Sequence, residues 1–260
     1  MKYSQSDVEK LRRDFSFTLK PWVESSSLGK ASEGNGWQSM IMGADFEMFN
    51  SVWISGLGAE CLDAALADLE ERNIAGHIQL SGAGLTHSKV MADRGYTIGS
   101  ASAFMAWHPD ETTESFTLRE GLEVSLVTNV AELESMLSVF QSTFHVDDAG
   151  MVYFRELFNN WNIPHLLWLL HDKGQLVSIV TSVVFENSVG IYSMATPESA
   201  QKKGYGAELL QYVQQHHVRA GQDTALLFAT PAGKFLYDKL GWNTLEYTQF
   251  YSRNPSSLLN

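Results

Sequence analysis

The sequence contains a single cysteine, Cys61, among 260 residues. One thiol excludes an internal disulfide and any metal site built from several cysteines. The eight histidines offer no alternative, because none is spaced with acidic partners as metal ligands usually are. His216 and His217 are adjacent on an expected helix and point in different directions, which favours a solvated pair over a ligand pair. We therefore expect no bound metal.

Long hydrophobic runs are also missing. No segment approaches the roughly 18 apolar residues that a membrane-spanning helix needs. The first residues, "MKYSQSDVEKLRRDF", lack the uninterrupted apolar core of a signal peptide. We therefore expect a cytoplasmic protein without a membrane partner.

Basic residues are scarce, since 18 Lys and Arg stand against 30 Asp and Glu and give a formal net charge of -12. Because nucleic acid is polyanionic, this charge argues against nucleic acid as a partner. Its field would mildly favour a cationic small molecule, although solubility alone explains the same acidic excess. Hydrophobic residues are abundant at 44%, which is typical of folded protein, and the length is sufficient for two domains.

From residue 122 the pattern alternates between strands and helices. Three strands separated by short turns predict an antiparallel meander. Asn129 begins the first helix with a plausible cap, and Thr230, Pro231 and Gly241 fit the two ends of a short late helix. The expected elements are strand 122–128, a helix to about Phe144, helix 152–161, strands 165–172, 176–185 and 189–196, a helix to about Arg219, strand 224–230, the short helix and strand 245–252.

The first half of the chain repeats the end of the second half. Residues 77–107 and 225–251 both read as strand, turn, helix, glycine, aromatic residue and strand, with Gly95 and Gly241 lying 146 residues apart. This self-similarity indicates a duplicated unit. The first copy lacks the glycine- and lysine-rich stretch of the second, "ATPESAQKKGYGAELLQYV" at 195–213. Glycines before a helix present main-chain N–H groups to an anion, so we expect a phosphate group there.

Two motifs of the second half carry a family resemblance. They are "QKKGYG" (201–206) and "LYDKLGW" (236–242), each in its expected strand and helix context. With them, residues 122–252 resemble the GNAT superfamily of N-acetyltransferases, whose pyrophosphate motif is R/Q-x-x-G-x-G/A. The whole chain is similar to a tandem-GNAT arrangement with a degenerate amino-terminal copy. The implied fold class is α/β (α+β), with two tandem GNAT-like domains, each a mixed and mostly antiparallel central sheet flanked by helices. The implied domains are residues 1–115, without the phosphate loop, and residues 121–260.

The resemblance implies that main-chain N–H groups around Gly204 bind the pyrophosphate of acetyl-CoA. Gln201 stands where the family usually has arginine, and Thr230 stands where it often has asparagine. The implied cofactor-binding residues are Met194, Ala195, Thr196, Gln201, Lys202, Lys203, Gly204, Tyr205, Gly206, Ala207 and Thr230.

Tyr237 occupies the position of the family's proton donor to the departing thiolate. The alternative is an aromatic residue that packs on the sheet. The N–H of Met194 is expected to face the thioester oxygen and to stabilise the negative charge that develops there. Met91 corresponds to Tyr237 in the first copy, and a methionine cannot donate a proton.

The base that deprotonates the acceptor amine is left open. Ser193 is a candidate that would hold a water, and Glu186 and His145 are further candidates, each with an ordinary structural interpretation. The prediction is an acyltransferase that moves an acetyl group from acetyl-CoA to the amine of a small molecule by direct transfer, as a monomer or homodimer. The alternative is a non-catalytic acyl-CoA-binding sensor or interaction module.

Overall fold

The computed structural model describes residues 3–110 and 113–253. Their contacts form two compact units. Unit 1 comprises Met1–Met105, Phe228–Phe235 and Asn243–Asn260, and unit 2 comprises Ala106–Leu227 and Leu236–Trp242. The predicted domain bounds, 1–115 and 121–260, extend beyond the described residues and group the chain differently. They assign 228–235 and 243–253 to the second domain, whereas the contacts place these segments in unit 1.

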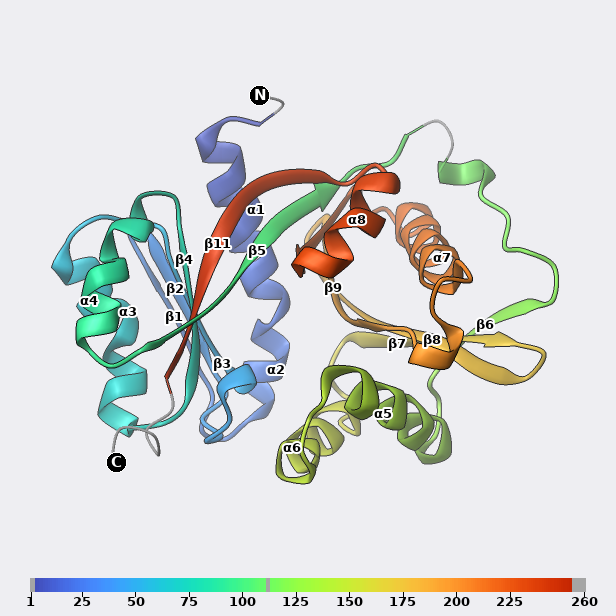
Figure 1. Ribbon diagram of the computed structural model, residues 1–260, viewed down its shortest axis with the longest axis horizontal. Coiled ribbons are helices and arrows are strands. Elements are labelled where there is room, and N and C mark those ends of the chain that lie inside the picture. Colours follow the sequence, from blue (N-terminus) through green and yellow to red (C-terminus); the bar gives the residue numbers. More distant parts are fainter. Residues whose placement is uncertain (1–2, 111–112, 254–260) are drawn as a thin grey trace. The chain divides into compact units, whose positions relative to one another are not determined.

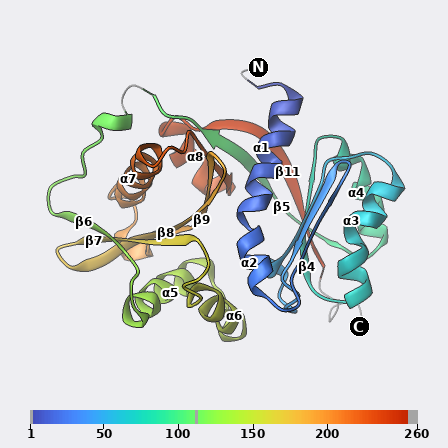
Figure 2. The same cartoon turned by 180° about the vertical axis from the view of Figure 1, so that it is seen from behind.

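Unit 1 is a sheet with helices on both faces. Its strand order is β1-β2-β3-β4-β11-β5. The pairs β1–β2, β2–β3 and β4–β11 are antiparallel, and β3–β4 is parallel. Helices α1 and α2 lie on one face of the sheet, and α3 and α4 lie on the other (Figures 1 and 2). The elements are α1 Gln5–Thr18, α2 Lys20–Ser25, β1 Lys30–Gly34, β2 Trp37–Ile41, η1 Glu47–Phe49, β3 Asn50–Ile54, α3 Ala59–Arg72, β4 Gly76–Ser81, η2 Gly82–His87, α4 Ser88–Asp93, β5 Thr97–Trp107 and β11 Asn243–Arg253.

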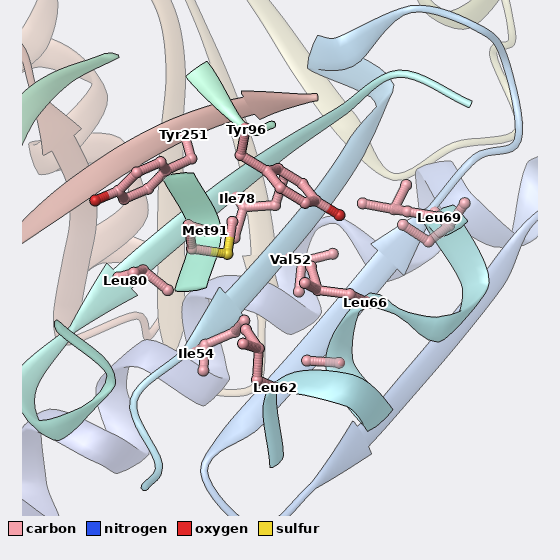
Figure 3. Packing of buried hydrophobic residues seen from close by; sticks show 12 residues of the cluster. Val52, Ile54, Leu62, Leu66, Leu69, Ile78, Leu80, Met91, Tyr96 and Tyr251 are labelled. Carbon is pink, nitrogen blue, oxygen red and sulfur yellow. The ribbon is translucent and has the colours of Figure 1, made fainter. Parts of the chain in front are cut away.

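An apolar cluster holds α3 and α4 to the sheet of unit 1. Leu62, Leu66 and Leu69 are spaced three or four residues apart, so they share one face of α3. Alternate residues of β3 and β4 face them, as expected for strands with one side in a core. Figure 3 shows these side chains converging, together with Met91 of α4 and Tyr251 of β11. The cluster places β11, which comes late in the sequence, firmly in unit 1.

Unit 2 has the predicted antiparallel meander at its centre. Its strand order is β10-β9-β8-β7-β6, in which β6 to β9 are antiparallel and β9–β10 is parallel. Helices α5 and α6 cover one face of this sheet and α7 covers the other (Figures 1 and 2). The elements that lie wholly or partly in unit 2 are η3 Thr113–Ser115, β6 Leu122–Leu126, α5 Val130–Phe144, α6 Asp148–Phe158, β7 His165–Asp172, β8 Gln175–Phe185, β9 Ser188–Ala195, η4 Glu198–Ala200, α7 Tyr205–Arg219, β10 Thr224–Ala229 and α8 Pro231–Lys239. The contacts of residues 228–235, which end β10 and begin α8, group them with unit 1.

The caps explain where two helices of unit 2 begin. The side chain of Asn129 accepts a hydrogen bond from the Glu132 N–H at 3.0 Å, which confirms the predicted start of α5. The prediction for α6 is wrong by four residues, because α6 starts at Asp148 and not at 152. Asp147 caps it by accepting from the Gly150 N–H at 2.7 Å. Gly150 lies in the first turn of α6, and because glycine disfavours a helix interior, the sequence pattern did not predict this start.

The expectation of a solvated histidine pair is wrong for His217. Its ring is buried, and its Nε2 lies 2.9 Å from the hydroxyl of Ser182 on β8. Burial lowers the pKa of His217 to about 4. The neighbouring His216 packs edge-on against Trp168, with ring centroids 4.8 Å apart. Both rings therefore belong to the packing between α7 and the sheet.

Helices α4 and α8 end in the same way, 146 positions apart. The N–H of Tyr96 donates to the Met91 carbonyl at 3.0 Å, and the N–H of Trp242 donates to the Tyr237 carbonyl at 3.1 Å. Gly95 and Gly241 have φ values of 80° and 79°. Only glycine adopts this left-handed conformation without strain, so the predicted equivalence of the two segments extends to their backbone.

Candidate functional site

The central strand β9 is irregular near its end. Ser193 has a φ of 51°, which is unusual for a residue other than glycine. The register with β8 shifts at this point, so that Ser193 and Met194 together face the single residue Val180. Such a bulge leaves main-chain groups outside the ladder, and strain of this kind is concentrated at functional sites.

The other edge of β9 is only partly paired. The parallel ladder joins residues 188–190 to residues 224–226 of β10 and, in the described part of the chain, has no further pair. Residues 191–195 of β9 therefore continue beyond the ladder. Their main-chain N–H and C=O groups need partners, and an extended ligand that contains amides can provide them.

The loop that follows β9 leads to an uncapped helix. The side-chain amide of Gln201 donates to the Thr196 carbonyl at 3.1 Å and closes the loop. Lys202 and Gly204 both have left-handed backbones, with φ values of 62° and 85°. Gly204 begins α7 without any side-chain cap, so the first N–H groups of the helix are available to an anion. A Cβ at Gly204 would meet nothing within 4 Å, which shows that space is open there.

The two lysines of the loop differ in their contacts. The ammonium of Lys203 donates to the Ser199 carbonyl at 3.0 Å. Lys202 is exposed at the left-handed turn of the loop. The loop therefore directs one of its two charges at its own main chain.

Gly206 brings the first turn of α7 against the end of β9. A Cβ at Gly206 would lie 3.1 Å from Met194 Cε and 3.3 Å from Thr196 Oγ1. Both distances are shorter than ordinary van der Waals contacts, so a side chain here would displace its neighbours.

Tyr237 of α8 points at the same strand. Its hydroxyl donates to Met194 Sδ at 3.5 Å, and its ring packs edge-on against Trp242 at 5.6 Å between centroids. The side chain as a whole is half-buried, but the desolvation around its hydroxyl raises the pKa of Tyr237 to about 12. The phenol therefore stays protonated at neutral pH and is available as a donor.

The structure thus brings together Ser193, Met194, Thr196, Gly206 and Tyr237. It separates Glu186 from them, because this residue lies in the turn before β9. Seven residues of extended chain put it roughly 20 Å from Ser193.

His145 ends α5 in a left-handed conformation with an exposed side chain, as a helix cap. The structural interpretation of Glu186 and His145 is therefore the better one.

Two of the predicted cofactor-binding side chains have other partners. The Tyr205 hydroxyl donates to the carboxylate of Asp172, and this bond raises the pKa of Tyr205. Thr230 Oγ1 accepts from the Gly233 N–H at 3.1 Å, which confirms that Thr230 caps α8. By its contacts, Thr230 belongs to unit 1. The roles of both residues in cofactor binding stay predictions.

Sequence reasoning missed Ser178 and Arg119. The buried hydroxyl of Ser178 donates to the Ala195 carbonyl at 2.9 Å and lies 3.0 Å from Thr196 Oγ1, so it fixes the end of β9. The guanidinium of Arg119 lies over the Tyr205 ring. A serine inside a strand and an arginine far away in sequence carry no local signal of such roles.

Two further features are absent from residues 3–110 and 113–253. They contain no group of three or more His, Cys, Asp or Glu side chains that could hold a metal ion. Over the same residues, no helix combines the length and the apolar character needed to cross a membrane.

Comparison with known proteins finds one family match, which lies within the second half of the chain. Residues 164–244 match the family model of the acetyltransferase (GNAT) domain. This segment includes the bulge of β9, the glycine loop, α7 and Tyr237. A search of curated proteins finds no match.

Solved structures resemble the chain over most of its length. A GCN5-related N-acetyltransferase from Kribbella flavida is 16% identical, with a TM-score of 0.65, 92% of this chain covered and 94% of that one. A GCN5-related N-acetyltransferase from Sphaerobacter thermophilus is 14% identical, with a TM-score of 0.62, and the match covers 84% of this chain and 76% of that one. A Drosophila protein is 15% identical, with a TM-score of 0.63, and the match covers 97% of each chain. These similarities confirm the predicted tandem-GNAT fold.

Proposed function

We propose that this chain, in which residues 164–244 match the acetyltransferase (GNAT) domain, moves an acetyl group from acetyl-CoA to the amine of a small molecule by direct transfer. One observation carries the proposal. Strand β9 opens at the bulge of Ser193 and Met194, with the uncapped start of α7 on one side and the hydroxyl of Tyr237 aimed at it.

The residues present fit the two parts of the acyl-CoA substrate. The N–H groups of the first turn of α7 suit a diphosphate, because they combine free donors with the positive end of the helix dipole. The loop residues Gln201 to Gly204 would surround it. The main chain of Met194, Ala195 and Thr196 suits an arm that contains amides, because this part of β9 extends beyond its ladder with β10.

The bulge supplies the stabilising donor for the chemical step. We assign to the Met194 N–H the role of hydrogen-bonding the thioester oxygen as negative charge develops there during attack by the amine. A donor held by a strained backbone needs no reorganisation at that moment. The side chain of Met194 has no part in this step, so the residue type at position 194 carries little information about the donor.

Tyr237 assists the departing sulfur mainly as a hydrogen-bond donor. A free thiol has a pKa of about 8.5, so complete proton transfer from a phenol whose pKa is about 12 would be uphill by roughly 5 kcal/mol. A hydrogen bond to the developing thiolate avoids this penalty. Tyr237 already donates to a sulfur, that of Met194, and the substrate sulfur would take that place.

The acceptor amine must lose a proton before or during attack, because an amine like that of lysine has a pKa of about 10.4. We propose that Ser193, beside the reacting position, holds the water that receives this proton. The acidic charge of the chain favours a cationic amine. We further propose that the amino-terminal copy does not bind acyl-CoA.

Calorimetry with acetyl-CoA, followed by a thiol-release assay with polyamines, amino acids, aminoglycosides and peptides, tests the proposed function. We expect saturable binding and release of free thiol with one of these amine classes. Binding without thiol release from any amine would support the acyl-CoA sensor instead. The absence of any binding would contradict both functions.

A further inference from the structure

A segment far from the glycine loop in sequence reaches its rim. Arg119 precedes β6, and its guanidinium lies 5.3 Å over the centroid of the Tyr205 ring. Its Nη1 donates to the Lys203 carbonyl at 3.3 Å, and its main-chain N–H donates to the Glu208 carboxylate at 3.3 Å. Main chain and side chain are therefore both attached to the start of α7.

These contacts do not use all the hydrogen-bonding capacity of Arg119. A guanidinium carries five N–H donors. Nη1 gives one to Lys203, and Nε lies only 3.8 Å from Glu208 Oε1, which is a loose ion pair. In the described structure Nη2 makes no hydrogen bond, and the side chain keeps 47% of its surface exposed. The Nη2 group of Arg119 is thus held next to the loop and has N–H donors available to a ligand.

Carboxylates next to the loop would oppose the binding of a phosphate group, so a cation besides Lys202 and Lys203 would strengthen it. Asp172 and Glu208 place two carboxylates next to Tyr205, which would repel a phosphate group bound at the start of α7. Gln201 carries no charge, and its amide is bonded to Thr196. Lys203 directs its ammonium at Ser199. Lys202 is exposed in the loop, whereas Arg119 is fixed at the start of α7 by its contacts to Tyr205, Lys203 and Glu208, so Arg119 is a pre-positioned cation that can offset the two carboxylates.

We propose that Arg119 binds a phosphate group of the acyl-CoA substrate at the rim of the loop Gln201–Gly204. The contacts to Tyr205, Lys203 and Glu208 hold the guanidinium in place before the ligand arrives, so little side-chain entropy is lost on binding. This inference rests on the proposed function, because it assumes that the same loop receives a nucleotide diphosphate.

The experiment measures the affinities of CoA and 3′-dephospho-CoA for the parent and for Arg119→Gln by calorimetry. Loss of one charge-assisted hydrogen bond should raise the dissociation constant of CoA about 10-fold. If the 3′-phosphate is the partner, 3′-dephospho-CoA will bind both proteins alike. If the pyrophosphate is the partner, Arg119→Gln will lose the same factor in affinity for CoA and for 3′-dephospho-CoA. Arg119→Lys should recover part of the loss, because it keeps the charge.

A matched control comes from Arg155, which is 48% exposed and paired with Glu134 in the same unit. Arg155→Gln makes the same change in net charge and should leave both affinities unchanged. S-acetylpantetheine, which carries no phosphate, detects a merely structural effect, and its rate as acyl donor should be equal in parent and Arg119→Gln.

Unchanged CoA affinity in Arg119→Gln, or an equal loss with S-acetylpantetheine, would overturn the inference while leaving the proposed function intact. A parent protein that fails to bind CoA would overturn both.

Discussion

Strands β3 and β9 hold corresponding places in the two units, but only β9 has an open end. In unit 1 the parallel ladder of β3 with β4 runs through four pairs to Ile54, the last residue of β3. The register of β3 with β2 is regular throughout. In unit 2 the ladder of β9 stops at Gly190, and a bulge interrupts its other edge. The same topology therefore yields one closed strand end and one open strand end.

The end of β3 is also covered by the chain itself. Gly84 of η2 lies so close that a Cβ there would be 2.2 Å from the Ile54 carbonyl oxygen. His87, at the end of η2, is buried with its Nε2 3.0 Å from the Gly56 carbonyl. A ligand could not add to β3 without displacing η2. The closed end of β3 is thus covered by a short 3-10 helix, which is the basis for our proposal that only unit 2 binds acyl-CoA.

The largest effect should come from Tyr237→Phe. Removal of the hydrogen-bond donor at the departing sulfur should lower kcat about 100-fold, the usual effect of losing one donor to a developing negative charge, while acetyl-CoA affinity stays the same. The thiol-release assay and calorimetry measure these two quantities separately.

Met91→Leu is the matched change in unit 1. Met91 is fully buried, and a swap of similar volume should cost less than about 1.5 kcal/mol of folding free energy and leave kcat unaltered. Equal losses of kcat in the two variants would contradict the assignment of the reaction to unit 2.

Acid should weaken unit 2 more than unit 1. Burial lowers the pKa of His165 and His217 in unit 2, and of His77 in unit 1, to about 4. Because these folded pKa values lie below the unfolded value of about 6.5, the stability is fully present above pH 6.5 and is lost as the pH falls toward 4. Each histidine should remove about 2 kcal/mol by pH 4.5.

Urea unfolding at pH 7 and pH 4.5 measures this loss of folding free energy. In His217→Gln the loss should be smaller by the contribution of that one histidine, about 2 kcal/mol. Hydrogen exchange, corrected for pH, should accelerate more in β7 and β8 than in β3 and β4. An unchanged pH dependence in His217→Gln would refute the role of that ring.

The smallest effect concerns two glycines that begin helices. Gly58 and Gly204 start α3 and α7 with φ values of 93° and 85°, and a Cβ at either would meet nothing within 4 Å. Alanine should therefore cost about 1 to 2 kcal/mol of folding free energy at Gly204, and up to about 3 kcal/mol at Gly58, whose ψ of 147° lies close to a region that only glycine readily adopts.

Only Gly204→Ala should also raise the dissociation constant of acetyl-CoA, by about 10-fold, because it distorts the phosphate loop. Thermal unfolding and calorimetry test the pair. Comparable weakening by Gly58→Ala would mean that unit 1 takes part in binding.

Features that depend on local backbone geometry could be predicted from the sequence. The caps at Asn129 and Thr230 and the left-handed Gly241 follow from preferences of single residues, and the structure confirms them. The glycine loop was found for the same reason. The bulge was not foreseen, because Ser193 adopts a positive φ that serine rarely shows.

Features that depend on long-range pairing were not predictable. The alternation at 245–252 predicts a strand but does not say that its partner is β4. The covering of Ile54 by Gly84 and the contact of Arg119 with Tyr205 join segments between 30 and 86 residues apart, for which a single sequence contains no signal.

The pairing of β11 with β4 imposes an order on biosynthesis. A ribosome makes β4 and its helices early, yet the neighbour of β4 in the sheet, Asn243–Arg253, emerges only after all of unit 2 has been translated. Until then the nascent chain carries an unsatisfied strand edge that invites association with other chains. A chain that ends before Asn243 would therefore lack the strand that completes the sheet of unit 1.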